Sequence, residues 1–496
     1  LAPWARPLLD QYPPAVCGFH RLWLADDVDL TLMFGDAAAM WSAQDAAVDA
    51  WFLDGFAPSR NPSMWSAALF TRLARLSRPG AALATFSAAG PARRGLAEAG
   101  FAVERRPGFG RKRHRVEARF PGRWTPRPAG RGHALVVGAG LAGCSTANAL
   151  AARGWTCRLI DASDIASAAS GNRSGVVYTT PSGMATPQNR FYQSSWLHAL
   201  RRFRRAGAED NGIARFGGVE QVLTDARHRR KALGALASGH WPVELLERLD
   251  DNRVLLVDGG VVRPPDWCRA LADRAEIEFR SGARVERLVG EHAVRLSDGT
   301  VLEADAVVLC TSGATTGLVE HLRLPIRTIR GQVTEVAARS ASREWTRAVC
   351  HTGYLAPAID GMHCVGATFD LHTSTDEIRD ADDRANLDAL RRWCPERWEA
   401  LGGEACEVRG ARVGFRCTSR DYLPLVGPLR PAPADEPAAH SPDSLPPPGL
   451  WLNIAFGSRG LSSTPLAAEC IADRLAGAPA PTDRAIRDAL APGRFR

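Results

Sequence analysis

A glycine-rich hexapeptide, Gly138-Ala-Gly140-Leu-Ala-Gly143, restricts the possible folds more than any other segment of this sequence. The apolar residues 134–137 precede it and indicate a strand, and the helical pattern of residues 145–154 follows it. A second apolar run, residues 156–160, ends at Asp161, about 20 residues beyond the glycines. Strand, turn, helix, strand and acid in this order predict a βαβ unit that binds a dinucleotide.

Each residue of the motif has a physical role in this interpretation. Gly138 permits a tight turn, Gly140 lets the backbone approach a pyrophosphate, and Gly143 lets helix and strand pack closely. The helix N-terminus offers free N–H groups to the phosphates. Asp161 can accept hydrogen bonds from ribose hydroxyls, and its charge disfavours NADP. The motif alone does not separate FAD from NAD.

Two downstream segments favour FAD. Residues 169–175 are small and polar and can follow a second stretch of the cofactor, with Ser170, Gly171, Asn172 and Arg173 as candidates. Near the C-terminus, a strand at 451–455 and a turn at Gly457-Ser458-Arg459-Gly460 lead into a helix that begins at Leu461. A second helix N-terminus there can stabilise a reduced, anionic flavin. An ordinary Ser/Gly loop and a turn packed in the core are the alternatives.

Composition restricts the function less. The chain has 496 residues and a formal charge of +8, carried mostly by arginine, which suits a polyanionic partner or a genomic bias equally. The 11 cysteines form no Cys-x-x-Cys pair, so we expect no metal site and a reducing cytoplasm. We see no apolar run that could span a membrane. The chain begins at Leu1 within a helical pattern, and we expect that it lacks an upstream portion.

The first 120 residues alternate between strands and helices, and the Pro/Gly/Arg-rich residues 121–130 read as a linker. A dense basic cluster falls near the end of this part, and arginines at such density can bind nucleic-acid phosphates while an aromatic side chain stacks a base. A solvated basic turn is the alternative. The cluster consists of Arg105, Arg106, Phe109, Arg111, Lys112 and Arg113.

Several motifs together carry a family resemblance. They are Asp49-Ala-Trp-Phe-Leu-Asp-Gly-Phe-Ala-Pro58 with Asn61-Pro62 and Met64-Trp65, Gly108-Phe-Gly-Arg-Lys-Arg113, Ser170-Gly-Asn-Arg173, Arg330-Gly-Gln-Val333, Gly353-Tyr-Leu355, Arg416-Cys-Thr-Ser-Arg-Asp421 with Leu423-Pro424, and Gly457-Ser-Arg-Gly-Leu461. The part from residue 131 onward resembles the D-amino-acid oxidase and glycine oxidase class of flavoenzymes. The whole chain resembles the bifunctional tRNA 5-methylaminomethyl-2-thiouridine biosynthesis family.

The resemblance implies an α/β chain of two parts. A partial, Rossmann-like S-adenosylmethionine-dependent methyltransferase domain covers 1–120, and a FAD-dependent oxidoreductase covers 131–496. Within the oxidoreductase we expect a Rossmann-type FAD-binding domain, built from about 131–215, 260–325 and 405–480. An antiparallel-sheet substrate domain is expected at about 216–259 and 326–404.

The implied reaction is oxidation of the carboxymethylaminomethyl group on the wobble uridine of tRNA, which releases glyoxylate and leaves aminomethyl uridine. Arg416, Arg459 and Tyr354 are the substrate-binding candidates, since arginine binds a carboxylate in bidentate fashion. Val285 resembles a residue whose backbone meets the adenine, and Gly313 is expected near the FAD. The partner is tRNA, contacted through its anticodon loop by a monomeric cytoplasmic enzyme.

The resemblance also implies that Asp54 faces the target amine and that Asp36 lies near the adenosine of the methyl donor. Strand Val28–Phe34 corresponds to the third strand of the methyltransferase sheet, and nothing before it supplies the glycine-rich loop that binds S-adenosylmethionine. We therefore expect an incomplete donor site and doubtful methylation. A free amino-acid, glycine or sarcosine oxidase is the alternative function, and a tRNA-binding module that keeps FAD for structure is a second one.

Overall fold

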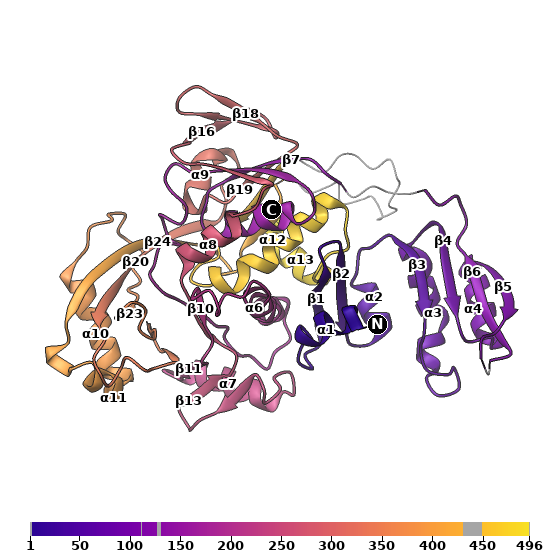
Figure 1. Cartoon of the computed structure of the whole chain (residues 1–496), viewed down its shortest axis with the longest axis horizontal. Coiled ribbons are helices and arrows are strands. Elements are labelled where there is room, and N and C mark those ends of the chain that lie inside the picture. The colour runs from indigo at the N-terminus through magenta and orange to yellow at the C-terminus, as the bar shows by residue number, and fades with distance from the viewer. Residues whose placement is uncertain (1, 111, 126–129, 430–448, 496) are drawn as a thin grey trace.

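The glycine-rich turn lies between a buried strand and a buried helix. In the computed structural model, which describes residues 2–110, 112–125, 130–429 and 449–495, β7 (His133–Val137) leads through it into α5 (Leu141–Ala151), and β8 (Thr156–Ile160) returns parallel to β7. This is the predicted βαβ unit (Figure 1).

The unit is part of a six-stranded sheet in the order β15-β8-β7-β19-β26-β25. Only β25 pairs antiparallel to its neighbour. Both faces are covered, which explains why the strands read as continuous apolar runs. The further strands are β15 (Ile277–Arg280), β19 (Ala306–Leu309), β25 (Leu425–Pro428) and β26 (Leu450–Ile454).

Strand β7 shows how the two faces are divided. Ala134 and Val136 belong to the core beneath the helices, whereas Leu135 and Val137 belong to the core beneath the sheet β16-β17-β18. Successive side chains of a strand point to opposite faces, so one short run serves both cores. The covering sheet consists of β16 (Val285–Leu288), β17 (Ala293–Leu296) and β18 (Val301–Glu303).

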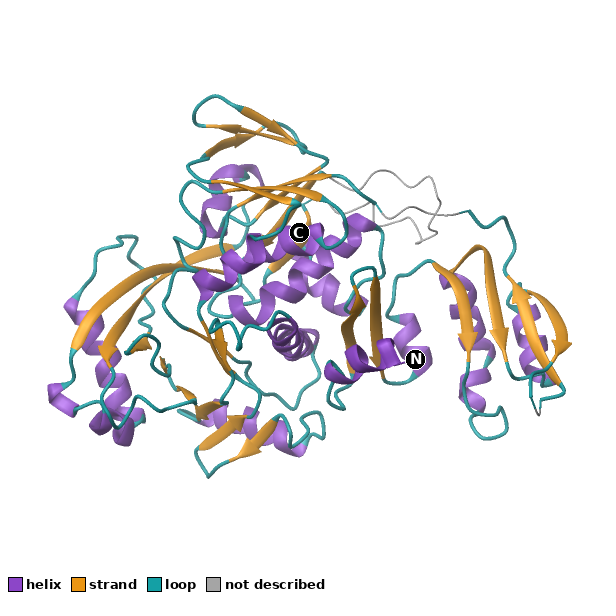
Figure 2. Cartoon of the chain, in the orientation of Figure 1, coloured by secondary structure: helices purple, strands orange, loops and turns teal. Residues whose placement is uncertain are grey.

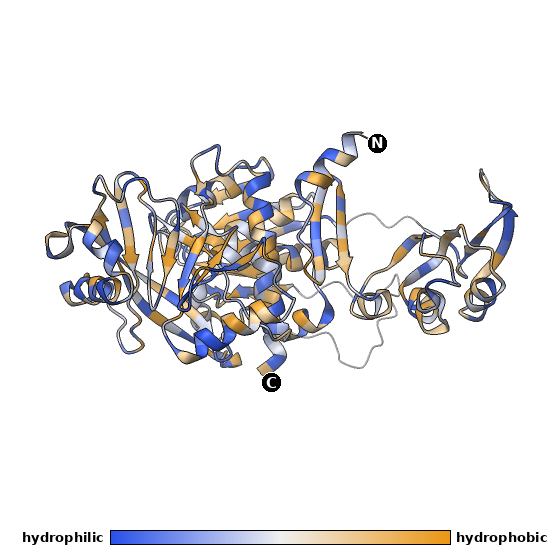
Figure 3. Ribbon diagram, turned by 90° about the horizontal axis from the view of Figure 1, so that it is seen from below, coloured by the Kyte–Doolittle hydropathy of each residue, from blue (hydrophilic) through white to orange (hydrophobic). Residues whose placement is uncertain are grey.

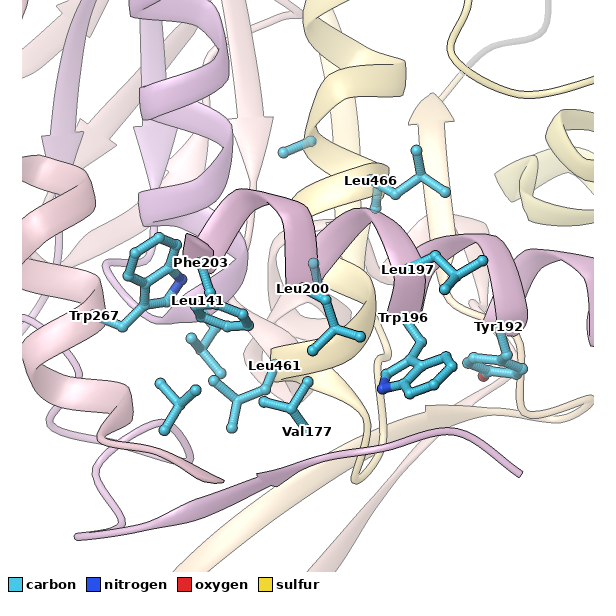
Figure 4. Close-up of a cluster of buried hydrophobic side chains, with 14 of the residues drawn as sticks. Leu141, Val177, Tyr192, Trp196, Leu197, Leu200, Phe203, Trp267, Leu461 and Leu466 are labelled. Atoms are coloured by element: carbon cyan, nitrogen blue, oxygen red, sulfur yellow. The ribbon is translucent and has the colours of Figure 1, made fainter. Parts of the chain in front are cut away.

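The helical layer packs around α6 (Pro187–Arg205). Its Trp196, Leu200 and Phe203 point toward Leu461 of α12 and Trp267 of α8 (Figure 4). Each such buried side chain stabilises the fold by about 2–3 kcal/mol. The other helices here are α8 (Pro264–Ala272), α9 (Thr315–Leu318), α12 (Gly460–Ala476) and α13 (Arg484–Leu490), with the short 3-10 helices η2 (Ser312–Ala314), η3 (Glu320–Leu322) and η5 (Pro492–Phe495).

A second, eight-stranded sheet stands beside the first in the order β12-β13-β11-β21-β22-β23-β20-β24. It is largely antiparallel (Figure 2). Its strands are β11 (Val219–Val222), β12 (Leu246–Arg248), β13 (Arg253–Leu256), β20 (Ile326–Ala337), β21 (Ala348–Cys350), β22 (Tyr354–Leu355), β23 (Met362–Gly366) and β24 (Val408–Ser419).

The helices of this part are α7 (Ala226–Ala237), α10 (Asp380–Trp393) and α11 (Pro395–Ala400), with η4 (Gly403–Ala405). The small sheet β10-β14-β9 accompanies the two larger ones. It consists of β9 (Gly175–Val177), β10 (Ala214–Arg215) and β14 (Gly260–Val262).

The N-terminal part contains a separate four-stranded sheet in the order β3-β4-β6-β5, at the far right of Figure 1. Its elements are β3 (Val48–Leu53), η1 (Pro62–Trp65), α3 (Ala67–Leu76), β4 (Ser77–Thr85), α4 (Gly90–Glu98), β5 (Ala102–Pro107) and β6 (His114–Arg119). Figure 3 shows hydrophilic residues along the outer hairpin of this sheet.

Strand β2 (Val28–Phe34) is not a member of that sheet. Among the described residues it pairs only with β1 (Gly18–Ala25), in an antiparallel hairpin flanked by α1 (Ala2–Asp10) and α2 (Ala37–Ser42). The sequence predicts β2 as the third strand of a methyltransferase sheet, so its placement in a separate hairpin differs from that expectation. The chain described here holds no strand that bridges β2 to β3.

The hairpin packs beside α6 (Figure 1), and a buried ion pair joins it to α12. Arg21 of β1 donates to Asp473 of α12 at 2.9 Å. Arg153 donates to the same carboxylate and to Glu469. Asp45 accepts from Arg484 and Arg487 and ties the four-stranded sheet to α13. No described helix combines the length and the apolar character that crossing a bilayer requires.

Candidate cofactor and substrate site

A cavity of about 570 Å³ opens at the carboxyl ends of β7, β19 and β26 and reaches the eight-stranded sheet. In open α/β sheets, ligands bind at this position. The cavity is lined by most of the residues that the sequence predicts. They are Gly138, Gly140, Asp161, Ser170, Asn172, Val285, Tyr354, Arg416, Gly457, Ser458, Gly460 and Leu461.

The first glycine turn has no room for side chains. Gly138 has φ +102°, and a Cβ there would lie 2.7 Å from the carbonyl oxygen of Cys310. A Cβ on Gly143 would lie 1.7 Å from the carbonyl oxygen of Gly138. Gly143 therefore serves the close packing of α5 and does not line the cavity, which leaves the N-terminus of α5 facing it.

Two polar side chains hold this turn. Asp161 accepts a hydrogen bond from the backbone N–H of Ala139 at 2.7 Å and another from Ser163 at 2.9 Å. Ser170 Oγ accepts from the N–H of Leu141 at 3.0 Å, and a Cβ on Gly140 would come within 2.9 Å of that oxygen. Asp161 thus shapes the turn in addition to lining the cavity.

The other residues of the loop after β8 point elsewhere. Gly171 packs against Arg412 and the backbone of Ala166. Arg173 pairs with Glu335 at 3.1 Å and with Asp360 at 3.7 Å, so it joins this loop to the second sheet. Neither residue lines the cavity.

A second helix N-terminus lies against the first. A Cβ on Gly460 would lie 3.3 Å from Leu141, and α12 starts without a side-chain cap. Beside it, the buried Asn453 lines the cavity, and its Oδ1 has no hydrogen-bond partner. Gly313 lies outside this lining, where a Cβ would meet Thr328 Oγ1 at 2.4 Å, while its neighbour Ser312 lines the cavity.

Arginine and tyrosine side chains gather at the end of the cavity near the second sheet. Arg416 of β24, Tyr354 of β22 and Tyr178 line it, and Arg416 donates to the carbonyl oxygen of Thr368 at 3.1 Å. Burial lowers the pKa of Arg416, while burial raises the pKa of both tyrosines. At neutral pH this end therefore presents one cation and two neutral hydroxyl groups.

Arg459 lies behind these residues, outside the cavity lining. It donates to Thr180 Oγ1 at 3.0 Å, and its guanidinium lies 4.2 Å from the centre of the Tyr192 ring. Its charge lowers the pKa of Tyr178 against the larger effect of burial. Arg459 thus lies close enough to Tyr178 to act on its hydroxyl group, without lining the cavity itself.

His351 also lines the cavity, and no motif of the sequence selects it. Its Nδ1 accepts a hydrogen bond from the N–H of Gly353 at 3.0 Å, and its buried Nε2 has no partner among the described residues. Burial lowers the pKa of His351 to about 4. The neutral ring therefore carries its proton on Nε2. Tyr178 and Asn453 are likewise residues that sequence reasoning missed.

Asp36 and Asp54, the two candidate carboxylates of the N-terminal part, follow strands of different sheets. Asp54 follows β3 and is exposed, whereas Asp36 follows β2 and caps α2 by accepting from Ala39 at 2.9 Å. Because β2 is not in the sheet of β3, the two carboxylates do not share one sheet edge. Asp36 and Asp54 therefore do not lie together at one site for S-adenosylmethionine.

The basic cluster occupies the hairpin of β5 and β6. Arg106 pairs with Glu104 and Glu117, and Lys112 lies over the ring of Phe86. Phe109 is 90% exposed at the tip. Desolvation, followed by the charges of Arg105 and Arg113, lowers the pKa of His114, so both arginines lie near this residue at the start of β6. Arg111 lies outside the described residues.

Comparisons with known proteins identify two family models that match different parts of the chain. A family model of FAD dependent oxidoreductases matches residues 133–474, and one of S-adenosyl-L-methionine-dependent methyltransferases matches residues 1–121. The chain is 41% identical over 534 residues to the tRNA 5-methylaminomethyl-2-thiouridine biosynthesis bifunctional protein MnmC of Pseudomonas paraeruginosa, which covers 100% of this chain and 81% of that protein. The protein of the same name from Chromobacterium violaceum is 39% identical with the same coverage.

Solved structures show the same fold for the flavin part. Glycine oxidase from Bacillus cereus superposes with a TM-score of 0.55 at 19% identity, over 70% of this chain and 95% of its own. L-proline dehydrogenase from P. horikoshii gives a TM-score of 0.58 at 16% identity, over 75% of this chain and 98% of its own.

Proposed function

The chain belongs to the family of tRNA 5-methylaminomethyl-2-thiouridine biosynthesis bifunctional proteins MnmC, and on that premise we propose that it oxidises a modified wobble uridine of tRNA. The substrate carries a 5-carboxymethylaminomethyl group, and the products are 5-aminomethyl uridine and glyoxylate. The observation that carries the proposal is Arg416, a half-buried arginine beside two neutral tyrosines at one end of the cofactor cavity.

The residues of the cavity fit FAD. Gly138 and Gly140 line the cavity at a turn that has no room for a Cβ, and the orphaned Oδ1 of Asn453 offers a hydrogen-bond acceptor. The N-termini of α5 and α12 direct free N–H groups and positive dipole ends toward negative charge. When bound, FAD supplies a two-electron acceptor for the carbon next to the substrate carboxylate. Asp161, Ser170 and Asn172 would hold its nucleotide half, and Gly457, Ser458 and Gly460 its flavin half.

Arg416 binds and orients the substrate. Its guanidinium can hold the carboxylate through two parallel hydrogen bonds, which places the neighbouring carbon at a defined position. The hydroxyl groups of Tyr354 and Tyr178 can donate further hydrogen bonds, because burial keeps both protonated.

The cavity favours a neutral substrate amine. Arg416 pairs with the substrate carboxylate, so a protonated amine would have no counter-charge beside it in a partly desolvated cavity, which costs free energy. Asp161 is the carboxylate among the described lining residues, and it lies at the glycine turn, away from Arg416. A neutral secondary amine can lose a hydride from its α-carbon and a proton from nitrogen, forming an imine. Water then cleaves the imine into the primary amine and glyoxylate.

The proposal is tested by incubating the FAD-loaded protein with tRNA that carries 5-carboxymethylaminomethyl-2-thiouridine and measuring wobble nucleosides by mass spectrometry. We expect 5-aminomethyl-2-thiouridine and an equal amount of glyoxylate. Free glycine and sarcosine serve as parallel substrates. Turnover of these amino acids without any change in the tRNA would instead establish a free amino-acid oxidase.

Methylation of the aminomethyl product with S-adenosylmethionine is the second activity of the family. Addition of S-adenosylmethionine to the same assay tests whether this chain performs it, since 5-methylaminomethyl-2-thiouridine is heavier by one methylene. We propose Asp54 as the residue that faces the amine, because it stands exposed at the carboxyl end of β3.

Three further proposals complete this function. The basic hairpin, including Arg105, Phe109 and Arg113, contacts the tRNA, which is supported by its exposed aromatic ring and by the positive charges of Arg105 and Arg113 near His114. Residues 1–120 and 131–496 form separate functional domains. The enzyme acts as a monomer in the cytoplasm, where tRNA is available.

A further inference from the structure

A second cavity, of about 710 Å³, lies where the N-terminal segment meets the flavin domain. Tyr12 and Trp23 line it from the segment that contains α1 and β1, and Arg201, Arg204 and Arg205 line it from the C-terminal half of α6. Figure 1 shows α1 and β1 beside α6, between the flavin domain and the β3–β6 sheet. No part of the oxidation described above uses this cavity.

Arg201 is a buried cation without a partner. Its residue is 7% exposed, its Nε has no hydrogen-bond partner, and no described residue forms an ion pair with it. Burial, together with the charge of Arg204, lowers the pKa of Arg201 to about 10, so it remains charged at neutral pH. Proteins normally pair buried charges, since an uncompensated one is destabilising. An unpaired guanidinium that lines a cavity therefore indicates an anionic ligand.

The neighbouring charges leave this cation uncompensated. Arg204 is paired with Asp258 at 2.9 Å, and Asp10 of the lining is paired with Arg6. Glu244, the remaining carboxylate of the lining, is exposed. Arg205 stacks 5.3 Å from the centre of the Trp23 ring, and its nearest carboxylate is the fully exposed Asp26 at 3.9 Å.

The aromatic residues favour RNA over a small anion. Tyr12 is 57% exposed beside the cavity, and a planar exposed ring next to arginine is a typical platform for an unstacked base. A free phosphate ion would use the arginines but neither ring, and the cavity is far larger than such an ion.

We propose that this cavity binds the tRNA backbone, with Arg201 and Arg205 as ligands of a phosphodiester group and Tyr12 as a stacking surface. The proposal rests on the function proposed above, because tRNA is the substrate there. It extends the tRNA contact from the distant β5–β6 hairpin to the junction of the two domains.

The test compares Arg201→Met and Arg205→Gln with wild-type FAD-loaded protein. Arg391→Gln is the matched control, because Arg391 is an exposed arginine on α10, remote from the cavity, and its loss changes the net charge equally. Binding of fluorescent tRNA is measured by anisotropy between about 50 and 200 mM salt. We expect Arg201→Met to weaken binding about ten-fold and to reduce the salt slope by about one. The control should bind like wild type.

Thermal melting separates a ligand role from a structural one. Removal of an unpaired buried charge should leave the melting temperature of Arg201→Met equal to or above that of wild type. A lower melting temperature would instead assign Arg201 a structural role and overturn the proposal. Equal tRNA affinity and salt slope in wild type and Arg201→Met would overturn it as well.

Inorganic phosphate and tripolyphosphate distinguish the source of the anion. If they raise the melting temperature of wild type but not of Arg201→Met, while tRNA affinity is unchanged, the site binds small anions and the RNA assignment is wrong. Glyoxylate release is measured separately, without reference to binding. Loss of tRNA affinity in Arg201→Met would thus support this site even if the protein produced no glyoxylate.

Discussion

Arginines withdrawn from the surface of this chain serve different purposes according to their partners. Arg330 is fully buried and donates to Asp382 at 2.6 Å, so its charge is compensated and it fastens α10 to β20. Arg416 has a backbone carbonyl and two tyrosines around it, which leaves its charge free for a ligand carboxylate. The same residue type is structural in one sheet strand and a ligand group in its neighbour, and only the surroundings distinguish the two.

Replacement of Arg416 tests the carboxylate site directly. Arg416→Gln should lower kcat/KM for glyoxylate release about a hundred-fold, because a charged, bidentate hydrogen bond is lost. Arg416→Lys should recover part of that loss, since it restores the charge but not the fork. Arg409→Gln is the control on the same strand, where Arg409 is exposed and pairs with Glu407. Unchanged kcat/KM in Arg416→Gln with full flavin content would refute the assignment.

His351 offers a prediction about pH. With a pKa of about 4, it stays neutral throughout the range in which the enzyme is assayed, so it should add no inflection to the rate profile between about pH 6 and 9. His351→Gln keeps an N–H donor and should retain most of the activity, whereas His351→Leu should raise KM. An inflection near pH 6.5 that disappears in His351→Gln would show that the ring titrates during catalysis.

At the scale of elements, two glycine turns that lie far apart in the sequence have the same structural role. The turns after β7 and β26 each lead into a helix whose N-terminus faces one cavity, and Gly460 and Leu141 bring these helix ends into contact. Parallel strands place their carboxyl ends at one edge, so residues about 320 positions apart in the chain meet there.

Gly138→Ala should abolish FAD binding. The alanine Cβ would lie 2.7 Å from a backbone oxygen that belongs to the neighbouring strand connection and cannot move away. Gly290→Ala is the matched control, because Gly290 has φ +73° and open space around its Cα. Both substitutions strain the backbone by about 1 kcal/mol, and only the first also forces the glycine turn away from the Cys310 backbone and so distorts the wall of the cavity. Flavin absorbance per mole of purified protein is the measurement, and equal content in both variants would contradict the role of the turn.

Local sequence pattern predicts the βαβ unit well, but it predicts poorly which residues line the end of the cavity near the second sheet. Residues 134–161 carry strand, turn and helix signals within one short stretch, and the structure confirms the βαβ unit. Tyr178 and His351 have no such signal, because their exposure to the cavity depends on how the second sheet packs against the first. Arg459 illustrates the same limit. It belongs to the second glycine turn, yet its guanidinium packs on the Tyr192 ring and not in the cavity lining. The sequence does not specify the direction of this side chain.

At the scale of the whole molecule, buried charge joins the N-terminal part to the flavin domain. Arg21 reaches from β1 to Asp473 of α12, and Arg153 binds both Asp473 and Glu469. The placement of β2 is related to this contact. The sequence places that strand in a methyltransferase sheet, whereas the structure places it in a hairpin whose partner strand carries Arg21. Long-range ion pairs of this kind have no sequence pattern, so they could not be predicted.

Removal of Arg21 should destabilise the junction. Arg21→Ala leaves Asp473 with less compensation in a buried position, and breaking such a pair costs about 3–5 kcal/mol. Arg6→Ala removes an exposed arginine of the same segment, which pairs with Asp10, and should cost at most about 1 kcal/mol. Urea denaturation followed by tryptophan fluorescence measures both. Similar losses in the two variants would mean that the buried network contributes no more than a surface pair.

The same network predicts an acid-sensitive junction. Burial would raise the pKa of Glu469, but the charges of Arg153 and Arg21 outweigh burial and lower it from 4.5 to about 2. A carboxyl group with a lowered pKa stabilises the fold above its unfolded value, and that stability is lost as the pH falls from about 4.5 toward 2. Asp473 acts in the opposite direction, because burial raises its pKa, and this limits the net effect. The free energy of unfolding, measured between about pH 7 and 3, should therefore fall more steeply in wild type than in Glu469→Gln, which lacks the titrating group. Parallel curves for the two proteins would show that Glu469 is not held ionised by these arginines.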